Sequence, residues 1–464
     1  AAPSAALIAA TSFLSMDFAA VPLLWIAPLA TYLLTFVLAF KREPWYPRRP
    51  GAGAAVAAAI LAALPVATAF WFAGDSTAAQ TLSRLFDFGK FAYVLLALFA
   101  LSMIFHTSLA ERRPDSERAM TEYYNWIAAG GLVGSVAVGV VVPWLGRNVG
   151  ATALDWAAVG ALAAAAIAAR DWEQVSSHPR TAGAVGLLAL ALTAGVATAG
   201  SRAGTVYGLR NFYGVYSVQD RDGVRWLFDG NTEHGMQYLA PDRQTEPLSY
   251  YGYGSPLREA WDCLGGRWTT VAVVGLGTGS IAAYGRPGMA MDFYELDPDV
   301  VAIARRWFTN LRLSRADIRI VTGDGRLSLK SADGAAYDAV ILDAFSSGAV
   351  PLHLLTKNAV ALYVRRLKPG GVILVHVSNR YLDLRPVLAA AARDLGLSGA
   401  SKRQVFAGRV EDGLTASVWV ALSPDGTRIE RLAREKGWRT FDGNTPAAVA
   451  WTDAHASILH ALAY

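Results

Sequence analysis

Long apolar stretches fill the chain before about residue 200, and shorter apolar runs separated by polar turns fill it afterwards. A helix needs about 20 mostly apolar residues to cross a bilayer. Six stretches meet this requirement, and we expect spanning helices over 18–40, 52–72, 88–109, 123–145, 151–169 and 181–199. Residues 1–14 are apolar but shorter, which is typical of an incomplete further span or an interfacial segment. The first 200 residues are therefore predicted to form a helical membrane domain of six or seven spans.

Past residue 200 the pattern is that of short strands and turns. The pairs Asp222-Gly223 and Asp229-Gly230 bound an apolar run, which predicts a β-hairpin. From residue 271 onward, β-branched apolar runs alternate with amphipathic ones, a pattern that favours a parallel α/β sheet. Strands are expected at 271–274, 291–296, 318–321, 337–342, in VILVHVSN and in TASVWVALS, with helices at 357–367 and 384–395. We expect three domains: a transmembrane domain at 1–200, a small β domain at 201–265 and a Rossmann-like domain at 266–464.

Glycines and acids follow the first four of these strands. Gly275, Gly277 and Gly279 come directly after the first strand, where a turn into a helix needs backbone freedom. Glu295 ends the second strand, 20 residues after Gly275, which is the usual distance for a carboxylate that binds ribose. The third strand ends at Asp324-Gly325 and the fourth at Asp343. Ligands bind at this edge of open α/β sheets, so the sequence predicts a nucleoside site.

A structural alternative exists for each acid, because acids at these positions are often helix N-caps. Asp297 and Asp299 precede an amphipathic run and are interpreted in that way. The ordered combination of glycine loop, ribose acid, Gly-Asp-Gly and strand-end acid favours the nucleoside interpretation for the others.

Composition narrows the class of protein. Hydrophobic residues make up 53% of the 464 residues and charged residues 17%, which is too apolar for an ordinary soluble protein. The single cysteine, Cys263, excludes an internal disulfide. The net charge is +5, and no basic stripe is interleaved with aromatic residues, so we expect no nucleic-acid partner. We also expect no metal.

The polar residues within the predicted spans have structural explanations that require no function. Asp17, Asn125 and Asp155 lie near span ends, where we expect an interfacial position, and a neighbouring backbone could satisfy His106. The loops 41–50, 111–120 and 170–180 hold nine Lys or Arg against five on the other side, which places the soluble half outside by the positive-inside rule. Binding of a cytosolic nucleoside would instead require the soluble half to lie in the cytoplasm. We give this chemical argument more weight than the count of basic residues and expect an inner- or plasma-membrane protein with a cytoplasmic catalytic domain.

The soluble half resembles the spermidine synthase family of polyamine aminopropyltransferases, in the branch fused to membrane helices. The ordered motifs DG, PLSYYGYGSPL, GLGTGS, YELDP, GDGR and YDAVILDAFSS carry the resemblance over about 224–395, and DFAAVPLLWIAPLATYLLTF and WTDAHASIL look like that branch too. The resemblance implies that Glu295 holds the ribose hydroxyls and that Asp324 with Gly325 holds the adenine amine. It also implies that the glycines border the methionine-derived chain, that Asp343 takes a proton from the attacking amine and that Tyr250 lines the acceptor groove.

This sequence departs from the family pattern in three places. Thr278 stands where the family has an acid for the aminopropyl ammonium, Ser346 replaces a second acid after the catalytic one, and Gly252 replaces the glutamate of a Tyr-His-Glu or Tyr-Gln-Glu motif. Without these acids, two ammonium groups of a diamine would be desolvated without partners. Putrescine is therefore a doubtful acceptor, and Thr278 could accommodate the carboxylate of S-adenosylmethionine. Further candidates for substrate contact are Glu233, His234, Gln237, Glu246, Ser346 and Asp453.

Three hypotheses follow from the sequence. The first is an enzyme that binds S-adenosylmethionine or its decarboxylated form and cleaves the propyl-side C–S bond, by transfer or lyase chemistry, to release methylthioadenosine. The second is a methyltransferase that uses the same sheet, and the third is a non-catalytic nucleoside sensor. The expected partners are a small-molecule amine or lipid acceptor and the bilayer, and a homo-oligomer is left open.

Overall fold

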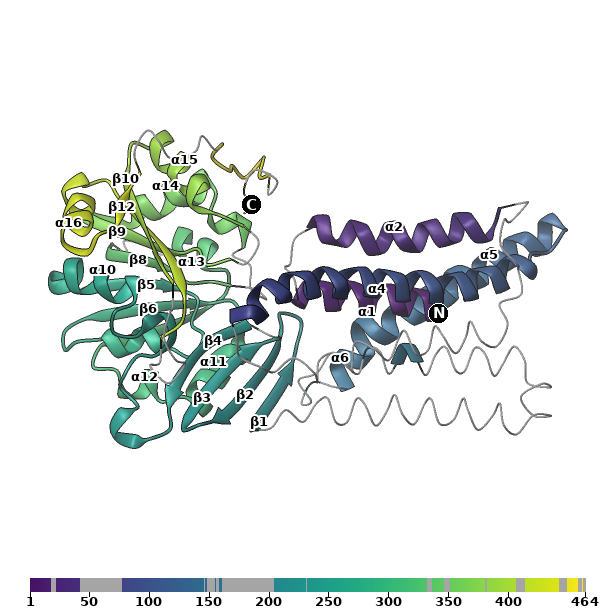
Figure 1. Cartoon of the computed structure of the whole chain (residues 1–464), viewed down its shortest axis with the longest axis horizontal. Helices are drawn as coiled ribbons and strands as arrows, with labels where there is room; N and C mark the ends of the chain where they lie inside the picture. The colour runs from purple at the N-terminus through teal and green to yellow at the C-terminus, as the bar shows by residue number, and fades with distance from the viewer. Residues whose placement is uncertain are drawn as a thin grey trace. The chain divides into compact units, whose positions relative to one another are not determined.

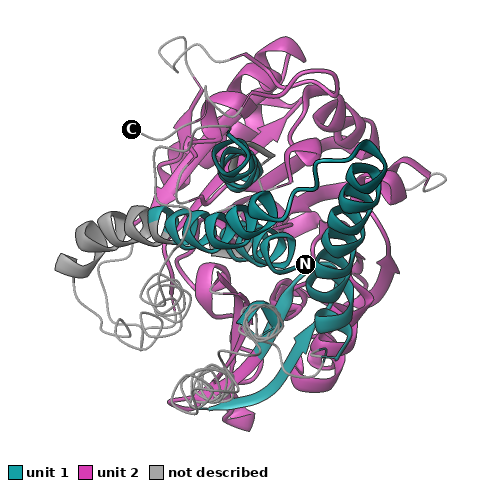
Figure 2. Cartoon of the chain, turned by 90° about the vertical axis from the view of Figure 1, so that its right-hand side faces the viewer, with its two compact units in different colours: residues 1–217 teal, residues 218–464 magenta. Residues whose placement is uncertain are grey.

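The structure is a computed structural model. It describes residues 1–17, 22–41, 77–145, 147, 155, 158–160, 204–230, 232–331, 336–345, 351–379, 382–405, 414–441, 449–457 and 461. The chain forms two compact units, Ala1–Ser217 and Val218–Tyr464 (Figure 2). The domain boundaries expected at residues 200 and 265 stay a prediction.

The first unit is mainly helical (Figure 1). Its helices are α1 (Ala2–Asp17), α2 (Pro22–Ala39), α4 (Thr77–Glu111) and α5 (Glu117–Val136), which continues through a π-helical segment (Ala137–Val141) into α6 (Val142–Leu145). Alanines of α1 pack against Val94 and Leu98 of α4 in a common core. A side chain at Gly134 would overlap the backbone of Ala1, so the small residues of α5 allow close helix packing.

Two of these helical stretches are long and apolar enough to cross a membrane, Val94–Glu111 and Glu117–Leu145. The helices over Ala2–Ser15 and Trp25–Ala39 are apolar but shorter. The spans predicted at 52–72 and 181–199 lie outside the described residues, as does most of 151–169. Six spans therefore remain a prediction.

Two polar side chains of this unit have partners that the sequence did not indicate. The Nδ1 atom of His106 lies 3.0 Å from the hydroxyl of Thr35, so a side chain of α2 satisfies it rather than a backbone group. Asp155 is buried within the protein, and it forms a bidentate ion pair with Arg210 at 2.7 and 2.8 Å. Each charge is therefore compensated inside the unit.

A small sheet has the strand order β1-β2-β3-β4. The strands are β1 (Thr205–Arg210), β2 (Val215–Arg221), β3 (Val224–Asp229) and β4 (Thr232–Tyr238), and the boundary between the two units falls within β2. Asp222 and Gly223 join β2 to β3 with positive φ angles of 49° and 76°, as a type I′ hairpin turn requires. The predicted hairpin is confirmed.

The second unit is built on an eight-stranded mixed sheet of order β12-β10-β11-β9-β8-β5-β6-β7. Strands β5 (Thr270–Val274), β6 (Ala290–Glu295), β7 (Asp317–Thr322), β8 (Tyr337–Leu342) and β9 (Leu367–His376) are parallel. Strands β10 (Ser398–Gln404), β11 (Ser417–Ser423) and β12 (Arg439–Thr440) pair antiparallel at one edge. Strands β5 to β8 lie within one residue of their predicted bounds, and β11 lies within two. β9 begins and ends earlier than predicted, and the sequence analysis did not predict β10 or β12.

Helices connect and cover these strands. They are α10 (Pro256–Leu264), α11 (Pro298–Trp307), α12 (Asn310–Leu313), α13 (Gly325–Ser331), α14 (Lys357–Arg366), α15 (Arg385–Asp394) and α16 (Gly426–Lys436). Short 3₁₀ turns lie at Pro241–Arg243, Ser249–Tyr251, Gly265–Arg267, Ser280–Tyr284 and Leu352–Leu354. The strand order reverses at β5, so the crevice for a ligand is expected where β5 and β8 end.

Candidate functional site

The glycine loop after β5 lies directly against the end of β8. Gly275 has φ of 97°, and a side chain there would overlap the backbone carbonyl of Asp343. Gly277 has φ of 53° and closely approaches the carbonyl of His234 on β4. Gly279 is left-handed and begins the turn Ser280–Tyr284. Glycine is therefore required at Gly275 and Gly277 by both conformation and space.

Glu295 at the end of β6 holds this loop in place. Its Oε2 accepts the backbone N–H of Leu276 and its Oε1 accepts that of Asp297, each at 2.9 Å. Burial raises the pKa of Glu295, and these N–H groups oppose the shift. Each carboxylate oxygen keeps a second lone pair, so the same group can also accept from ribose hydroxyls.

Asp324 makes the capping contact that the sequence left open, and its role in binding adenine stays a prediction. Its Oδ1 accepts the N–H of Leu327 in the first turn of α13, which is a helix-capping contact. Its Oδ2 lies 3.2 Å from Nε2 of His353, and the carboxylate is still partly exposed. Gly325 packs against Val274 of β5, where a larger residue would collide.

Asp343 is the centre of a buried hydrogen-bond network. Its Oδ1 lies 2.7 Å from Nδ1 of His376, and its Oδ2 accepts the hydroxyl of Tyr251 at 2.5 Å. The side chains of Asp343 and His376 are only 4% and 3% exposed. Leu342 and Val375 are register partners on β8 and β9, so the next residue of each strand meets across the same edge. Parallel pairing therefore creates the Asp-His contact.

Aromatic side chains enclose the imidazole of His376. Trp419 stacks on it at a centroid distance of 4.7 Å and an angle of 8°, and Tyr250 and Phe345 contact it at 4.4 and 4.7 Å. The hydroxyls of Tyr250 and Tyr251 form a hydrogen bond of 3.0 Å. Burial raises the pKa of both phenols well above the ordinary value, and the charge of Asp343 adds to the shift. The ring is thus held in one orientation.

A groove of about 650 Å³ opens beside this network. Side chains from β4, from the turn with Tyr250 and from the ends of β9, β10 and β11 line it, namely Thr232, Glu233, Tyr250, Phe345, His376, Ser378, Asn379, Arg403, Gln404, Val405, Thr415, Ala416, Ser417 and Val418. Tyr250 is one of the residues that line this groove, and its contact with an acceptor stays a prediction.

Glu233 presents an unpaired carboxyl oxygen to the groove. Its Oε1 is enclosed and has no hydrogen-bond partner among the described residues. Burial raises the pKa of Glu233 to about 7, against a hydrogen bond from Ser249 that lowers it. Ser249 itself has a positive φ of 60°, a strained conformation for a residue with a side chain. Glu233 therefore lines the groove with one carboxyl oxygen to which none of the described residues donates.

His234 is partly buried next to this region, and within the described part of the chain its enclosed Nε2 has no partner. Burial lowers the pKa of its imidazole, and the charges of Asp229 and Asp343 oppose this shift. His234 belongs to the same electrostatic environment as Asp343 and His376, but it does not line the groove.

The other predicted substrate residues lie elsewhere. Gln237 holds Thr309 and Asn310 through its amide, Glu246 pairs with exposed Arg243, and Asp453 forms a bidentate pair with Arg326. Their polar groups already have partners within the chain, so these residues make structural contacts in place of the predicted substrate contacts. Ser346 lies outside the described residues.

Thr278 is almost completely buried. Its hydroxyl lies 2.6 Å from that of Ser280, and a side chain at Gly235 would overlap it. Contact between Thr278 and a cofactor carboxylate stays a prediction, because it would require this hydroxyl to turn away from Ser280.

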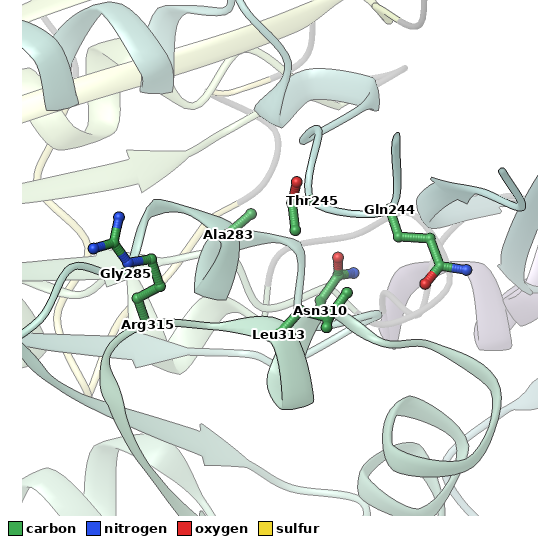
Figure 3. Close-up of a pocket in the computed structure, with 7 residues that line it drawn as sticks. All are labelled: Gln244, Thr245, Ala283, Gly285, Asn310, Leu313 and Arg315. Carbon is green, nitrogen blue, oxygen red and sulfur yellow. The ribbon is translucent and has the colours of Figure 1, made fainter. Parts of the chain in front are cut away.

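A second, smaller cavity of about 170 Å³ lies beside the turn Ser280–Tyr284 and α12 (Figure 3). It is lined by Gln244, Thr245, Ala283, Gly285, Asn310, Leu313 and Arg315. Gln244 and Asn310 are already hydrogen-bonded to Gln237 and Thr309. We interpret this cavity as a packing feature. Within the described ranges no cluster of His, Cys, Asp and Glu could hold a metal ion.

Sequence reasoning missed Tyr251, His376 and Ser378. Ser378 Oγ lies 2.6 Å from Nε2 of His376 and accepts the N–H of Val418 at 2.8 Å. The sequence signal for His376 and Ser378 was weak. The strand run VILVHVSN ends in polar residues, but a lone histidine in that position has many structural explanations.

No protein-family model matches the chain. Among curated proteins, the polyamine aminopropyltransferase of Vibrio vulnificus is 34% identical over 111 residues, which are 23% of this chain and 36% of that protein. Spermidine synthase 2 of Arabidopsis thaliana is 31% identical over 109 residues, 23% of this chain and 32% of its own. Putrescine N-methyltransferase 3 of Nicotiana tabacum is 29% identical over 122 residues, 26% of this chain and 30% of its own.

Two solved structures can be aligned with part of the chain. A probable spermidine synthase from Corynebacterium glutamicum is 17% identical with a TM-score of 0.41, and it covers 55% of this chain and 98% of its own. Spermidine synthase from Thermotoga maritima is 13% identical with a TM-score of 0.36, over 53% of this chain and 81% of its own. The chain spans about a third of the length of the curated relatives it matches.

Proposed function

About a quarter of the chain is homologous to the spermidine synthase family, and from this premise we propose that the protein is a membrane-anchored transferase acting on a sulfonium nucleoside. The observation that carries the proposal is the meeting of the glycine loop, Glu295 and Asp343 where β5 and β8 end. This is the position at which open α/β sheets bind their ligands.

The nucleoside is S-adenosylmethionine or its decarboxylated form. Glu295 would accept from the ribose hydroxyls and Asp324 from the adenine amine, and the glycines let the methionine-derived chain approach the backbone. Glu295 is buried and fixed by two N–H groups, so it is oriented before the ligand arrives. Such preorganisation lowers the entropic cost of binding.

The reaction joins an acceptor amine to the propyl chain. The nitrogen attacks the propyl carbon bonded to the sulfonium sulfur, a C–N bond forms, and the C–S bond breaks with its electron pair left on sulfur. Methylthioadenosine leaves, and the nitrogen loses a proton. With S-adenosylmethionine itself the products would be those of aminocarboxypropyl transfer or, without an acceptor, of an intramolecular lyase step.

The groove favours an acceptor with one cationic group. Glu233 offers an enclosed carboxyl oxygen without a partner in the described part of the chain, which would accept from one ammonium. Among the residues that line the groove, Glu233 is the only acid, and a diamine would bring two charges. Burying the second charge without a partner costs several kcal/mol. A small monoamine or an amine-bearing lipid therefore fits better than putrescine.

Membrane anchoring rests on the helical unit. Val94–Glu111 and Glu117–Leu145 have the length and composition of spans. Trp126 and Trp144 of the second stretch are 71% and 74% exposed, and such large apolar surfaces suit contact with lipid. A bilayer partner would also give access to a lipid acceptor.

A methyltransferase is the second candidate, because a putrescine N-methyltransferase matches a similar length of this chain. The two reactions differ in which carbon next to sulfur faces the acceptor. A non-catalytic nucleoside sensor is the third candidate, since the site could bind without turnover.

Product identification tests these candidates. The full-length protein is incubated with each nucleoside and a panel of monoamines, diamines and aminolipids, and the released nucleoside is identified by mass spectrometry. Methylthioadenosine is the expected product, whereas S-adenosylhomocysteine would support the methyltransferase. Calorimetric binding of methylthioadenosine without any turnover would support the sensor. Glu295→Gln is the binding control and should lose ~1.5–3 kcal/mol of binding free energy.

A further inference from the structure

We propose that Ser378 and His376, and not Asp343, receive the proton that the acceptor loses, with Asp343 and Tyr251 as positioning residues. The inference rests on the proposed transferase function and assigns the proton path of the same site.

Asp343 is not among the residues that line the groove, whereas His376 and Ser378 are. The carboxylate of Asp343 is engaged by two neighbouring side chains: its Oδ1 lies 2.7 Å from Nδ1 of His376, and its Oδ2 accepts the hydroxyl of Tyr251. A general base must come within hydrogen-bond distance of the proton it removes. Of the groups that line the groove, the imidazole of His376 and the hydroxyl of Ser378 are the ones joined to Asp343 through hydrogen bonds.

The hydrogen bonds around Ser378 fix the direction of the proton path. The N–H of Val418 donates to Ser378 Oγ at 2.8 Å, which leaves the hydroxyl proton free to point to Nε2 of His376 at 2.6 Å. The other ring nitrogen, Nδ1, then carries the proton that is donated to the carboxylate of Asp343 at 2.7 Å. The partners therefore assign the tautomer in which Nε2 is the acceptor.

The charged and titratable groups around the imidazole are compatible with a single added proton. Asp343 lies on one side, Tyr250 and Tyr251 on another, and His234 acts on the site electrostatically. Burial lowers the pKa of His234, which favours its neutral form and keeps a second positive charge away from His376. Asp343 would stabilise the imidazolium as it forms.

The proton balance is as follows. As the acceptor nitrogen forms its bond to the propyl carbon, its proton passes to Ser378 Oγ while the hydroxyl proton of Ser378 passes to Nε2 of His376. The imidazolium that results is held by Asp343, and the sulfur keeps the electron pair of the broken C–S bond. Release of the proton to solvent through the groove restores the neutral ring.

Kinetics of four variants test the assignment. His376→Gln should reduce kcat by roughly 10²–10⁴-fold, the usual contribution of general-base catalysis. Ser378→Ala should reduce kcat by roughly tenfold or more, and Ser378→Thr, which keeps a hydroxyl, should restore most of it. Methylthioadenosine affinity should stay within about twofold in all three, because the loss is at the reacting centre. The exposed His455→Gln is the matched control and should behave as wild type.

A kcat of His376→Gln close to wild type would overturn the proposal and return the base role to Asp343. A readout independent of activity comes from nitrogen-15 NMR of histidine-labelled protein, in which the signal lost in His376→Gln identifies the ring. The Nδ1–H tautomer is expected, and an Nε2–H tautomer would overturn the relay even if no acceptor supports turnover. Failure of the wild type to release any nucleoside would count against the proposed function alone.

Discussion

At the scale of single residues, the candidate site is defined by which polar atoms already have partners. Glu246 and Asp453 look like substrate acids in the sequence, but Arg243 and Arg326 neutralise them. Glu233 is the opposite case, because its Oε1 is enclosed and no partner for it is found in the described part of the chain. The free energy of folding must therefore depend on whether Glu233 is ionised.

We predict that Glu233→Gln removes part of the pH dependence of stability. Burial raises the pKa of Glu233 from an ordinary value of 4.5 to about 7, so the folded state favours the neutral form. Its contribution is fully present below the ordinary pKa and is lost as the pH rises through about 7, to a limit of roughly 3 kcal/mol. Melting temperatures of wild type and variant should therefore differ at pH 8 in favour of the variant and converge near pH 5.

The matched control is Glu246→Gln, which removes an exposed carboxylate that is paired with Arg243. It should leave the shape of the pH–stability curve unchanged. Parallel curves for wild type and Glu233→Gln over pH 5–8 would show that the carboxyl of Glu233 is not enclosed as described.

At the scale of elements, the site exists because strand ends and loops approach one another closely. β8 and β9 are parallel neighbours, which brings Asp343 and His376 together, and the loop after β5 passes against the backbone of Asp343. Trp419 on β11 stacks on the ring from the antiparallel side of the sheet. A change in loop geometry should therefore affect ligand binding more than global stability.

Gly275→Ala tests this coupling. A methyl group there would meet the carbonyl of Asp343, and the positive φ of 97° adds backbone strain. Affinity for methylthioadenosine should fall by roughly tenfold or more, equivalent to about 1.4 kcal/mol, as measured by calorimetry.

Gly288→Ala is the matched comparison, because Gly288 has φ of 79° but open space around it. This variant should lose about 1–2 kcal/mol of stability through backbone strain, but it should bind methylthioadenosine as tightly as wild type. Equal affinity losses in both variants would show that strain alone, and not the contact with Asp343, governs the loop.

At the scale of the whole molecule, the proposed membrane anchor makes the orientation of the second unit a testable property. The count of basic residues in the loops favours the outside, and the proposed nucleoside chemistry favours the cytoplasm. The spans predicted at 52–72 and 181–199 determine whether the chain crosses an even or an odd number of times, and both lie outside the described residues. We give the proposed chemistry more weight, because it would use a cytosolic nucleoside.

We predict that residues 201–464 face the cytoplasm. A pair of reporters fused after Tyr464, one active only in the cytoplasm and one only outside, measures this directly. Activity of the cytoplasmic reporter is expected. Activity of the external reporter alone would confirm the charge count and would require the nucleoside to be supplied outside.

The sequence by itself determined the parts of this protein that depend on local pattern. Length and period of apolar runs placed the strands of the sheet, Asp222-Gly223 located the hairpin, and glycines and acids after successive strands located the ligand edge. These features involve residues that are close in the sequence, so backbone geometry leaves few alternative structures for them.

Only the tertiary structure decided which of the polar side chains meet. His376 lies 33 residues from Asp343, Tyr251 lies 92 residues from it, and Arg210 lies 55 residues from Asp155. No local pattern records such pairs, because they depend on strand order and on the register between strands. Asp453 is likewise paired with Arg326, 127 residues away, whereas Glu246 pairs locally with Arg243. Glu233 keeps one oxygen without a partner among the described residues, and this difference separates a structural acid from a candidate binding group.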